Sequence, residues 1–132
     1  MTVPKEVPAE VEASIRRLVA RYCHLVDDGD LDAAIELFSD DARFINLGEE
    51  LKGRDAIREM LADQPSGPTL HQVTNVVVSN GSHDGTFHSV SDVSMNAKRG
   101  DVWSAVFAGR FHDTFAGTGR GMRFTQRILT GR

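Results

Sequence analysis

The chain has 132 residues, of which 40% are hydrophobic and 26% charged, values typical of one globular domain rather than a disordered or fibrous chain. Its 19 acidic and 15 basic residues give a net charge of −4, and the basic residues are scattered, so we expect no nucleic-acid partner. Cys23 is the only cysteine, so no disulfide can form within the chain. No apolar run approaches the ~20 residues of a membrane-spanning helix, so we expect no membrane contact. The opening segment lacks the apolar stretch of a signal peptide, and the sequence therefore predicts a cytoplasmic protein.

The first half of the chain predicts three helices. Apolar residues recur at three- and four-residue steps over residues 8–28, which indicates an amphipathic helix that Gly29 ends. Asp30 is suited to cap a second helix over residues 31–38. A third helix is expected over residues 54–64, before a break that contains proline and glycine.

Strand signals dominate the second half of the chain. A short hairpin is expected first, with a strand at residues 42–47 and its return at residues 51–52. Four longer segments rich in Val, Phe, Thr and Ser follow, separated by turns that contain glycine. These segments are residues 70–79, 86–98, 102–115 and 122–129.

Helices that precede a run of long antiparallel strands indicate an α+β fold. We expect a single domain over residues 1–132, with a flexible tail at residues 1–9. Its architecture is predicted to be a cone, in which a curved antiparallel sheet packs against the three N-terminal helices. Strands of this length twist and curl, so a sheet closed by helices leaves an internal pocket for a small apolar or cyclic molecule.

This order of elements is accompanied by the segments RYCHLVDDGDLDAAIELFSDDARF, KGRDAI, LHQVTN, GRFHD and RFTQRIL. From about Ile15 to Leu129 the chain resembles the SnoaL-like families of the nuclear transport factor 2 superfamily. The resemblance implies the cystatin-like roll of that superfamily. The chain looks most like a subgroup of scytalone dehydratase, bile-acid dehydratase and dehydrochlorinase relatives, which are cofactor-free lyases. We therefore expect no cofactor, and an enzyme that removes water or a similar group from a cyclic apolar substrate or shifts a double bond.

The resemblance also implies a catalytic site. Carried over by position, the aspartate of the subgroup falls on Asp27, its tyrosine on Tyr22 and its histidine on His71. Its arginine falls on Arg127. A carboxylate that holds a histidine fixes the tautomer of the imidazole and strengthens it as a base, so Asp27 would orient His71 for proton removal from carbon. Tyr22 and Arg127 would stabilise the negative charge that develops.

Each of these residues also has a structural interpretation. At 100° per residue, Asp27 lies about 140° from Tyr22 around the helix, so periodicity alone makes Asp27 a flanking, solvated residue at a polar helix end. Tyr22 could instead pack in the core, His71 could be a surface histidine, and Arg127 could be a solvated strand arginine.

Three further residues are candidates for substrate contact. Asn75 shares a strand face with His71 in an unbroken strand and is predicted to bind substrate, or else to tie down a β-bulge. Trp103 and Phe107 could stack on a ring or pack beneath the helices. Aromatic residues on an outer sheet face would need cover, which predicts a homodimer or higher oligomer. The reserve candidates, whose facing depends on strand register, are His88, Asp92, Arg110 and His112.

Two other functions remain open. The superfamily often keeps its cavity after losing the chemistry, so a non-catalytic ligand-binding or assembly module is the first alternative. An isomerase or epoxide hydrolase with a carboxylate pair is the second, and Asp92 or Asp113 would have to supply its second acid. The histidines do not show the spacing of a zinc motif, so we expect no metal site. Cys23 has no flanking basic-triad signature, so we expect it to be packed rather than nucleophilic.

Overall fold

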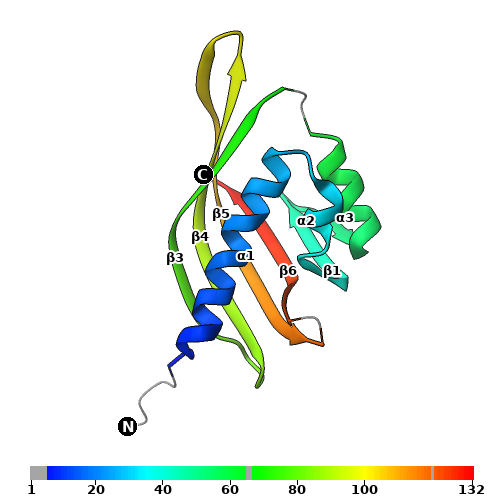
Figure 1. Ribbon diagram of the computed structural model, residues 1–132, viewed down its shortest axis with the longest axis vertical. Helices are drawn as coiled ribbons and strands as arrows, with labels where there is room; N and C mark the ends of the chain where they lie inside the picture. The colour runs from blue at the N-terminus through cyan, green and yellow to red at the C-terminus, as the bar shows by residue number, and fades with distance from the viewer. Residues whose placement is uncertain (1–5, 65–66, 120) are drawn as a thin grey trace.

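The computed structural model describes residues 6–64, 67–119 and 121–132, and within them three helices pack on one side of a six-stranded sheet (Figure 1). The helices are α1 (Ala9–Asp27), α2 (Leu31–Ile35) and α3 (Gly53–Ala62). The strand order across the sheet is β2-β1-β6-β5-β4-β3. The strands are β1 (Phe38–Asn46), β2 (Glu49–Lys52), β3 (Thr69–Asn80), β4 (Thr86–Arg99), β5 (Val102–Thr118) and β6 (Gly121–Gly131).

The described residues agree with the predicted order of elements, and the α+β cone is confirmed. Of the tail expected at residues 1–9, residues 1–5 lie outside the described part, and Ala9 already belongs to α1. Residues 65–66 of the break expected after the third helix also lie outside it. No helix of the described residues is long and apolar enough to cross a membrane.

Helix α1 forms one wall of the cone because its apolar stripe faces the sheet. It ends at Asp27, where Gly29 turns the chain with a φ of +75°, a conformation that glycine adopts without steric cost. The Asp30 carboxylate then accepts a hydrogen bond of 3.3 Å from the backbone N–H of Ala33 and caps α2. The buried residues of α1 are Ile15, Leu18, Val19, Tyr22 and Cys23.

The second helix is shorter than its sequence pattern predicts. Helical periodicity extends to Phe38, but α2 ends at Ile35 and Phe38 begins β1. Phe38 pairs with Phe124 of β6, and the Phe124 N–H donates to the Leu37 carbonyl at 2.9 Å. Pairing with a distant strand, together with complete burial of Phe38, outweighs the local helical preference.

The sheet is mixed rather than wholly antiparallel. Strands β2 and β1 form the expected hairpin, and β3 to β6 form an antiparallel meander. Strand β1, however, runs parallel to β6, with Phe44 opposite Arg127. Parallel neighbours need a long crossover connection, and here the chain between β1 and β6 passes through α3 and the rest of the sheet.

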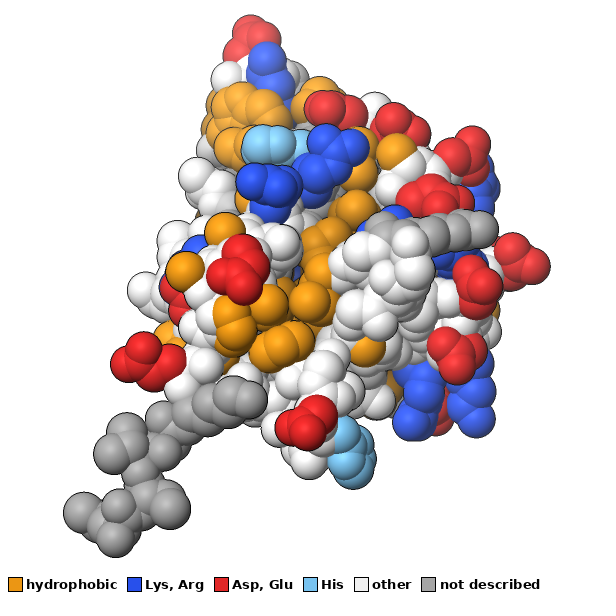
Figure 2. Space-filling model, turned by 60° about the horizontal axis from the view of Figure 1, so that its bottom comes forward, with side chains coloured by type: hydrophobic (Ala, Val, Ile, Leu, Met, Phe, Trp, Pro, Cys, Tyr) orange, Lys and Arg blue, Asp and Glu red, His pale blue; other side chains and the backbone are white. Residues whose placement is uncertain are grey.

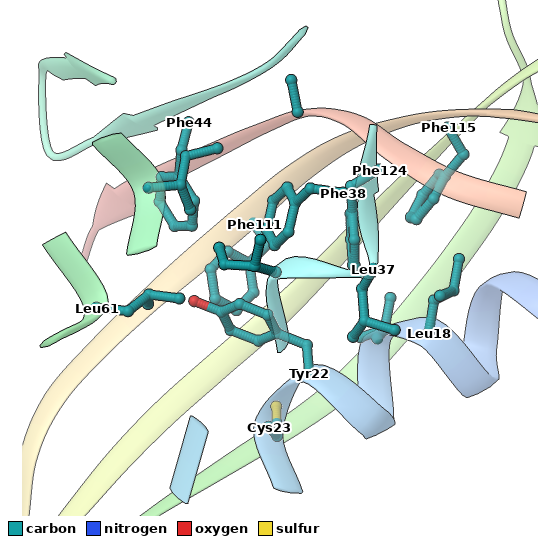
Figure 3. Packing of buried hydrophobic residues seen from close by; sticks show 14 of the residues in the cluster. Leu18, Tyr22, Cys23, Leu37, Phe38, Phe44, Leu61, Phe111, Phe115 and Phe124 are labelled. Atoms are coloured by element: carbon teal, nitrogen blue, oxygen red, sulfur yellow. The ribbon is translucent and has the colours of Figure 1, made fainter. Parts of the chain in front are cut away.

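The core between helices and sheet contains a group of aromatic rings among its aliphatic side chains. Figure 3 shows Tyr22 rising from α1 into a group of phenylalanines, and the rings of Phe38 and Phe124 stack with centroids 5.0 Å apart. Burial of each such side chain contributes about 1.5–3 kcal/mol. On the face drawn in Figure 2, hydrophobic side chains form a band down the middle with charged side chains around it, so part of the apolar interior reaches the surface.

One ion pair lies inside this core. The Arg127 Nε donates to Asp113 Oδ1 at 2.9 Å, and the Arg127 Nη2 donates to Asp113 Oδ2 at 3.2 Å. Both side chains are 0% exposed. The guanidinium carbon lies 3.4 Å from the centre of the Phe111 ring. The pair is therefore desolvated, so each charge depends on the other.

Asp113→Ala should lower the free energy of unfolding by about 3–5 kcal/mol, because Arg127 would remain charged and buried without its partner. Urea denaturation measures this loss. The double variant Asp113→Leu/Arg127→Met removes both charges and should recover most of it. A loss below about 1 kcal/mol for Asp113→Ala, as small as that of an exposed pair, would contradict this assignment.

Candidate active site

A cavity of about 490 Å³ lies between the helices and the inner face of the sheet. This volume is within the range of about 300–1,000 Å³ that small-molecule sites occupy. Its wall is built from α1, α3 and every strand except β2, and most of its side chains are apolar. The apolar lining residues are Val26, Phe44, Leu47, Met60, Leu61, Val93, Met95, Ala97, Val106, Phe107, Phe111 and Leu129.

His71 is part of this wall, and Asp27 binds its imidazole ring. The Nδ1 atom of His71 lies 2.5 Å from Asp27 Oδ1, and the backbone N–H of His71 donates to Asp27 Oδ2 at 2.8 Å. The Thr69 hydroxyl donates to Asp27 Oδ1 at 3.0 Å. Three hydrogen bonds thereby join Asp27, the last residue of α1, to Thr69 and His71 near the start of β3.

The position of Asp27 differs from what helical periodicity alone predicts, because its side chain is only 9% exposed. Strand β3 is the edge of the sheet, so backbone N–H groups on its outer side have no neighbouring strand to pair with. The end of α1 meets this edge, and Asp27 accepts the N–H of His71 there. A residue on the flank of the apolar stripe therefore faces a strand instead of water.

The bond to Asp27 sets the protonation geometry of the imidazole. An ionised carboxylate only accepts hydrogen bonds, so the hydrogen of a neutral His71 must be on Nδ1. The lone pair is then on Nε2, the ring nitrogen that Asp27 does not bind. Because the side chain of His71 lines the cavity and is 16% exposed, Nε2 is available to a bound molecule.

Tyr22 lines the same cavity from the side of α1. In Figure 3 its hydroxyl points toward Leu61, another residue of the cavity wall. Burial raises the pKa of Tyr22 to about 12, against a smaller opposing effect of Arg127. The phenol is therefore protonated at neutral pH and can donate a hydrogen bond.

The neighbouring Cys23 is not suited to act as a nucleophile. It is buried, and burial raises the pKa of its thiol to about 11. Only the thiolate is a strong nucleophile, and a thiol with this pKa stays protonated near neutral pH.

Arg127 is not on the cavity wall. The predicted role of Arg127, to face the charge of a substrate, requires a position on the cavity wall. Its guanidinium is instead fully buried and bonded to Asp113. Its guanidinium carbon lies 4.3 Å from the centre of the Tyr22 ring. Arg127 therefore contacts the ring of Tyr22. It is also not a solvated strand arginine, which was the alternative interpretation.

Of the three residues expected to contact substrate, the structure brings only Phe107 to the cavity. Asn75 has a φ of 55° at a β-bulge, is exposed, and donates to Asp92 at 2.9 Å. The bulge inserts an extra residue, so Asn75 no longer shares the face of His71. Trp103 lies 47% exposed near the end of the β4–β5 hairpin. The oligomer that would cover exposed apolar residues stays a prediction.

The reserve candidates do not reach the cavity wall. Asp92 bonds to Asn75 and Arg110, His112 is exposed, and the ring of His88 contacts the Thr114 hydroxyl. Asp113 faces inward but is bonded to Arg127, so neither Asp92 nor Asp113 forms a carboxylate pair in the cavity. In the described part of the chain, no group of three His, Cys, Asp or Glu side chains could hold a metal ion.

Five polar residues of the described cavity wall were not predicted: Asn46, Gln64, Thr69, Lys98 and Arg99. Thr69 supports Asp27, and Lys98 and Arg99 line the cavity at the end of β4. The signal for Thr69 is strand alternation, because residues two apart share a face and Thr69 precedes His71 by two. Alternation likewise places Arg99 on the face of Met95, although the sequence does not reveal that this face is the inner one.

A cone with an internal cavity, on whose wall an aspartate holds a histidine, has the nuclear transport factor 2-like, cystatin-like fold. The SnoaL-like domain matches residues 8–128, and the chain belongs to this family. The family resemblance seen in the sequence is thus confirmed, and the dehydratase and dehydrochlorinase subgroup stays a prediction.

Solved structures agree with this fold. A nuclear transport factor 2-like protein from Novosphingobium aromaticivorans is 24% identical, with a TM-score of 0.84 over 92% of this chain and 82% of that one. ActVI-ORFA from Streptomyces coelicolor is 17% identical, with a TM-score of 0.86 over 93% and 98%. A protein from Catenulispora acidiphila in complex with S-DNPA is 18% identical, with a TM-score of 0.83 over 94% and 95%. No curated protein matches the chain significantly.

Tyr22 should titrate near pH 12 in the folded protein and near pH 10 in the unfolded chain. Because the folded state keeps its proton longer, the free energy of unfolding should fall as the pH rises through this window. Tyr22 is the only tyrosine, so the ultraviolet absorbance of tyrosinate reports on it alone. The chain unfolded in urea is the control, and a midpoint near pH 10 in folded protein would disprove the burial of the phenol.

Proposed function

We propose that this protein is a cofactor-free lyase or isomerase that removes a proton from a carbon atom of a small cyclic, largely apolar substrate. The reaction would be a dehydration, a related elimination or a double-bond shift. The observation that carries the proposal is the contact between His71 Nδ1 and Asp27 Oδ1 at 2.5 Å on the wall of an apolar cavity. A positioned general base of this kind contributes about 10²- to 10⁴-fold to a rate.

His71 is the proposed general base. Its Nε2 would take the proton from carbon, and the ring would become an imidazolium. The Asp27 carboxylate, bonded to Nδ1, would stabilise that cation and keep the ring aimed at the cavity. Asp27 is thus a positioning residue, itself held by the Thr69 hydroxyl.

Tyr22 is the proposed hydrogen-bond donor to the negative charge that develops on a carbonyl or leaving-group oxygen. Its phenol is protonated at neutral pH and belongs to the same wall as His71. A preorganised donor in a site with little water stabilises such a charge more than it would in bulk solvent. Arg127, packed against the Tyr22 ring and bonded to Asp113, would act as a positioning residue for Tyr22.

The likeness to a Catenulispora acidiphila protein that was solved with the small molecule S-DNPA supports a ligand in this cavity. A ligand-binding module without catalysis would use the same cavity, and the Asp27–His71 contact favours the enzyme. No carboxylate pair lies on the described part of the cavity wall, so nothing there favours the isomerase or epoxide hydrolase of that type.

The proton-transfer step can be tested without knowledge of the leaving group. Two-ring ketones such as 1-tetralone carry acidic C–H bonds, and nuclear magnetic resonance follows the exchange of these hydrogens in D₂O. For ketones that bind, His71→Ala should keep binding but exchange at least about 10²-fold more slowly. Asp27→Asn should cause a comparable loss, because its amide N–H₂ can donate to Nδ1 and shift the histidine hydrogen to Nε2.

The matched control is His112→Ala, which removes an exposed histidine that lies outside the cavity and should leave exchange unchanged. Unchanged exchange in His71→Ala would remove His71 as the base. Ketones that bind to the wild-type protein without any faster exchange would instead support the ligand-binding module.

A further inference from the structure

The cavity wall is basic although the chain is acidic overall. Lys98 and Arg99 line the cavity, and among its described lining residues there is no Asp or Glu. The whole chain has a net charge of −4, so the charge of the cavity wall is opposite in sign to the net charge of the protein. Among the ion pairs formed by the described residues, none involves Lys98 or Arg99.

The two basic side chains stand at the mouth of the cavity. The β4–β5 hairpin extends beyond the body of the molecule in Figure 1, and Lys98 and Arg99 are the last residues of β4 before its turn. Val106, a lining residue of β5 next to this hairpin end, is 45% exposed and marks the opening. Arg99 is itself exposed and Lys98 half-buried.

His71 lies further inside, on the neighbouring strand. It pairs with Met95 of β4, four residues before Arg99. At about 3.3 Å per residue, the Cα levels of His71 and Arg99 are roughly 13 Å apart along the strand. A molecule of two or three fused rings could therefore contact His71 with one end and the basic side chains with the other.

We infer that the cavity takes a ring-containing ligand with an anionic group, a carboxylate or a phosphate, at the end opposite His71. Lys98 and Arg99 would bind the anion at the mouth through charge-assisted hydrogen bonds. The Asp27 carboxylate behind His71 disfavours the anion at the inner end, so the charges also orient the ligand. This inference rests on the proposed function for its assignment of His71 as the reactive end.

The test compares probes that differ in charge alone. Sodium 2-naphthaleneacetate and its uncharged amide share the same rings, and calorimetry at low salt and pH 7.5 gives both dissociation constants. Wild-type protein should bind the acetate about tenfold more tightly. In Lys98→Gln/Arg99→Gln the preference should fall to within about twofold, and in wild-type protein it should weaken at high salt. The pair 2-naphthyl phosphate and 2-naphthol tells whether a phosphate is preferred to a carboxylate.

Arg17→Gln/Arg21→Gln is the matched control, because it removes two positive charges on α1 outside the cavity and should keep the preference. Equal affinity of wild-type protein for the charged and uncharged probes, or a preference that survives Lys98→Gln/Arg99→Gln, would overturn the inference. The preference should persist in His71→Gln, which lacks the proposed base. Failure of the charge preference and failure of the proposed catalysis are therefore seen in different experiments.

Discussion

The carboxylate of Asp27, bound to the outer edge of β3, is the interaction on which the candidate site depends. An edge strand presents backbone N–H groups that no neighbouring strand accepts, and Asp27 accepts one of them at His71. The same carboxylate holds the imidazole of that residue and accepts a bond from Thr69. One side chain therefore joins the end of α1 to the sheet and also binds Nδ1 of His71, which leaves Nε2 for a bound molecule. Its structural role and its proposed chemical role have the same physical origin.

The second constraint is the buried charge beneath the cavity. Arg127 and Asp113 neutralise each other in a core of aromatic rings, and the Arg127 guanidinium packs against Tyr22, Phe111 and Phe124. The guanidinium packs on the ring of Tyr22, and burial, against the smaller opposing effect of Arg127, keeps the phenol protonated at the wall. The cavity thus has a largely apolar wall that carries the proposed base and the proposed hydrogen-bond donor, together with Lys98 and Arg99.

Local sequence patterns were sufficient to predict the main helices and strands. Where a prediction from these patterns was wrong, contacts between residues far apart in the sequence explain the difference. The apolar stripe of α1 and the long strands are visible in the sequence because each element repeats with its own period. The start of β1 was missed because Phe38 pairs with β6, far along the chain. Family resemblance placed Asp27 and His71, whereas periodicity alone placed Asp27 in water. Asn75 was misplaced by a β-bulge and Arg127 by its burial with Asp113, neither of which strand alternation reveals.

The most direct test of this account is the tautomer of His71, because the proposed chemistry needs a free lone pair on Nε2. Nitrogen-15 chemical shifts of labelled protein, measured above the pH at which the ring loses its charge, distinguish Nδ1–H from Nε2–H. The account predicts hydrogen on Nδ1 in the wild-type protein and on Nε2 in Asp27→Asn. Hydrogen on Nε2 in the wild-type protein, or rapid exchange between both forms, would contradict it.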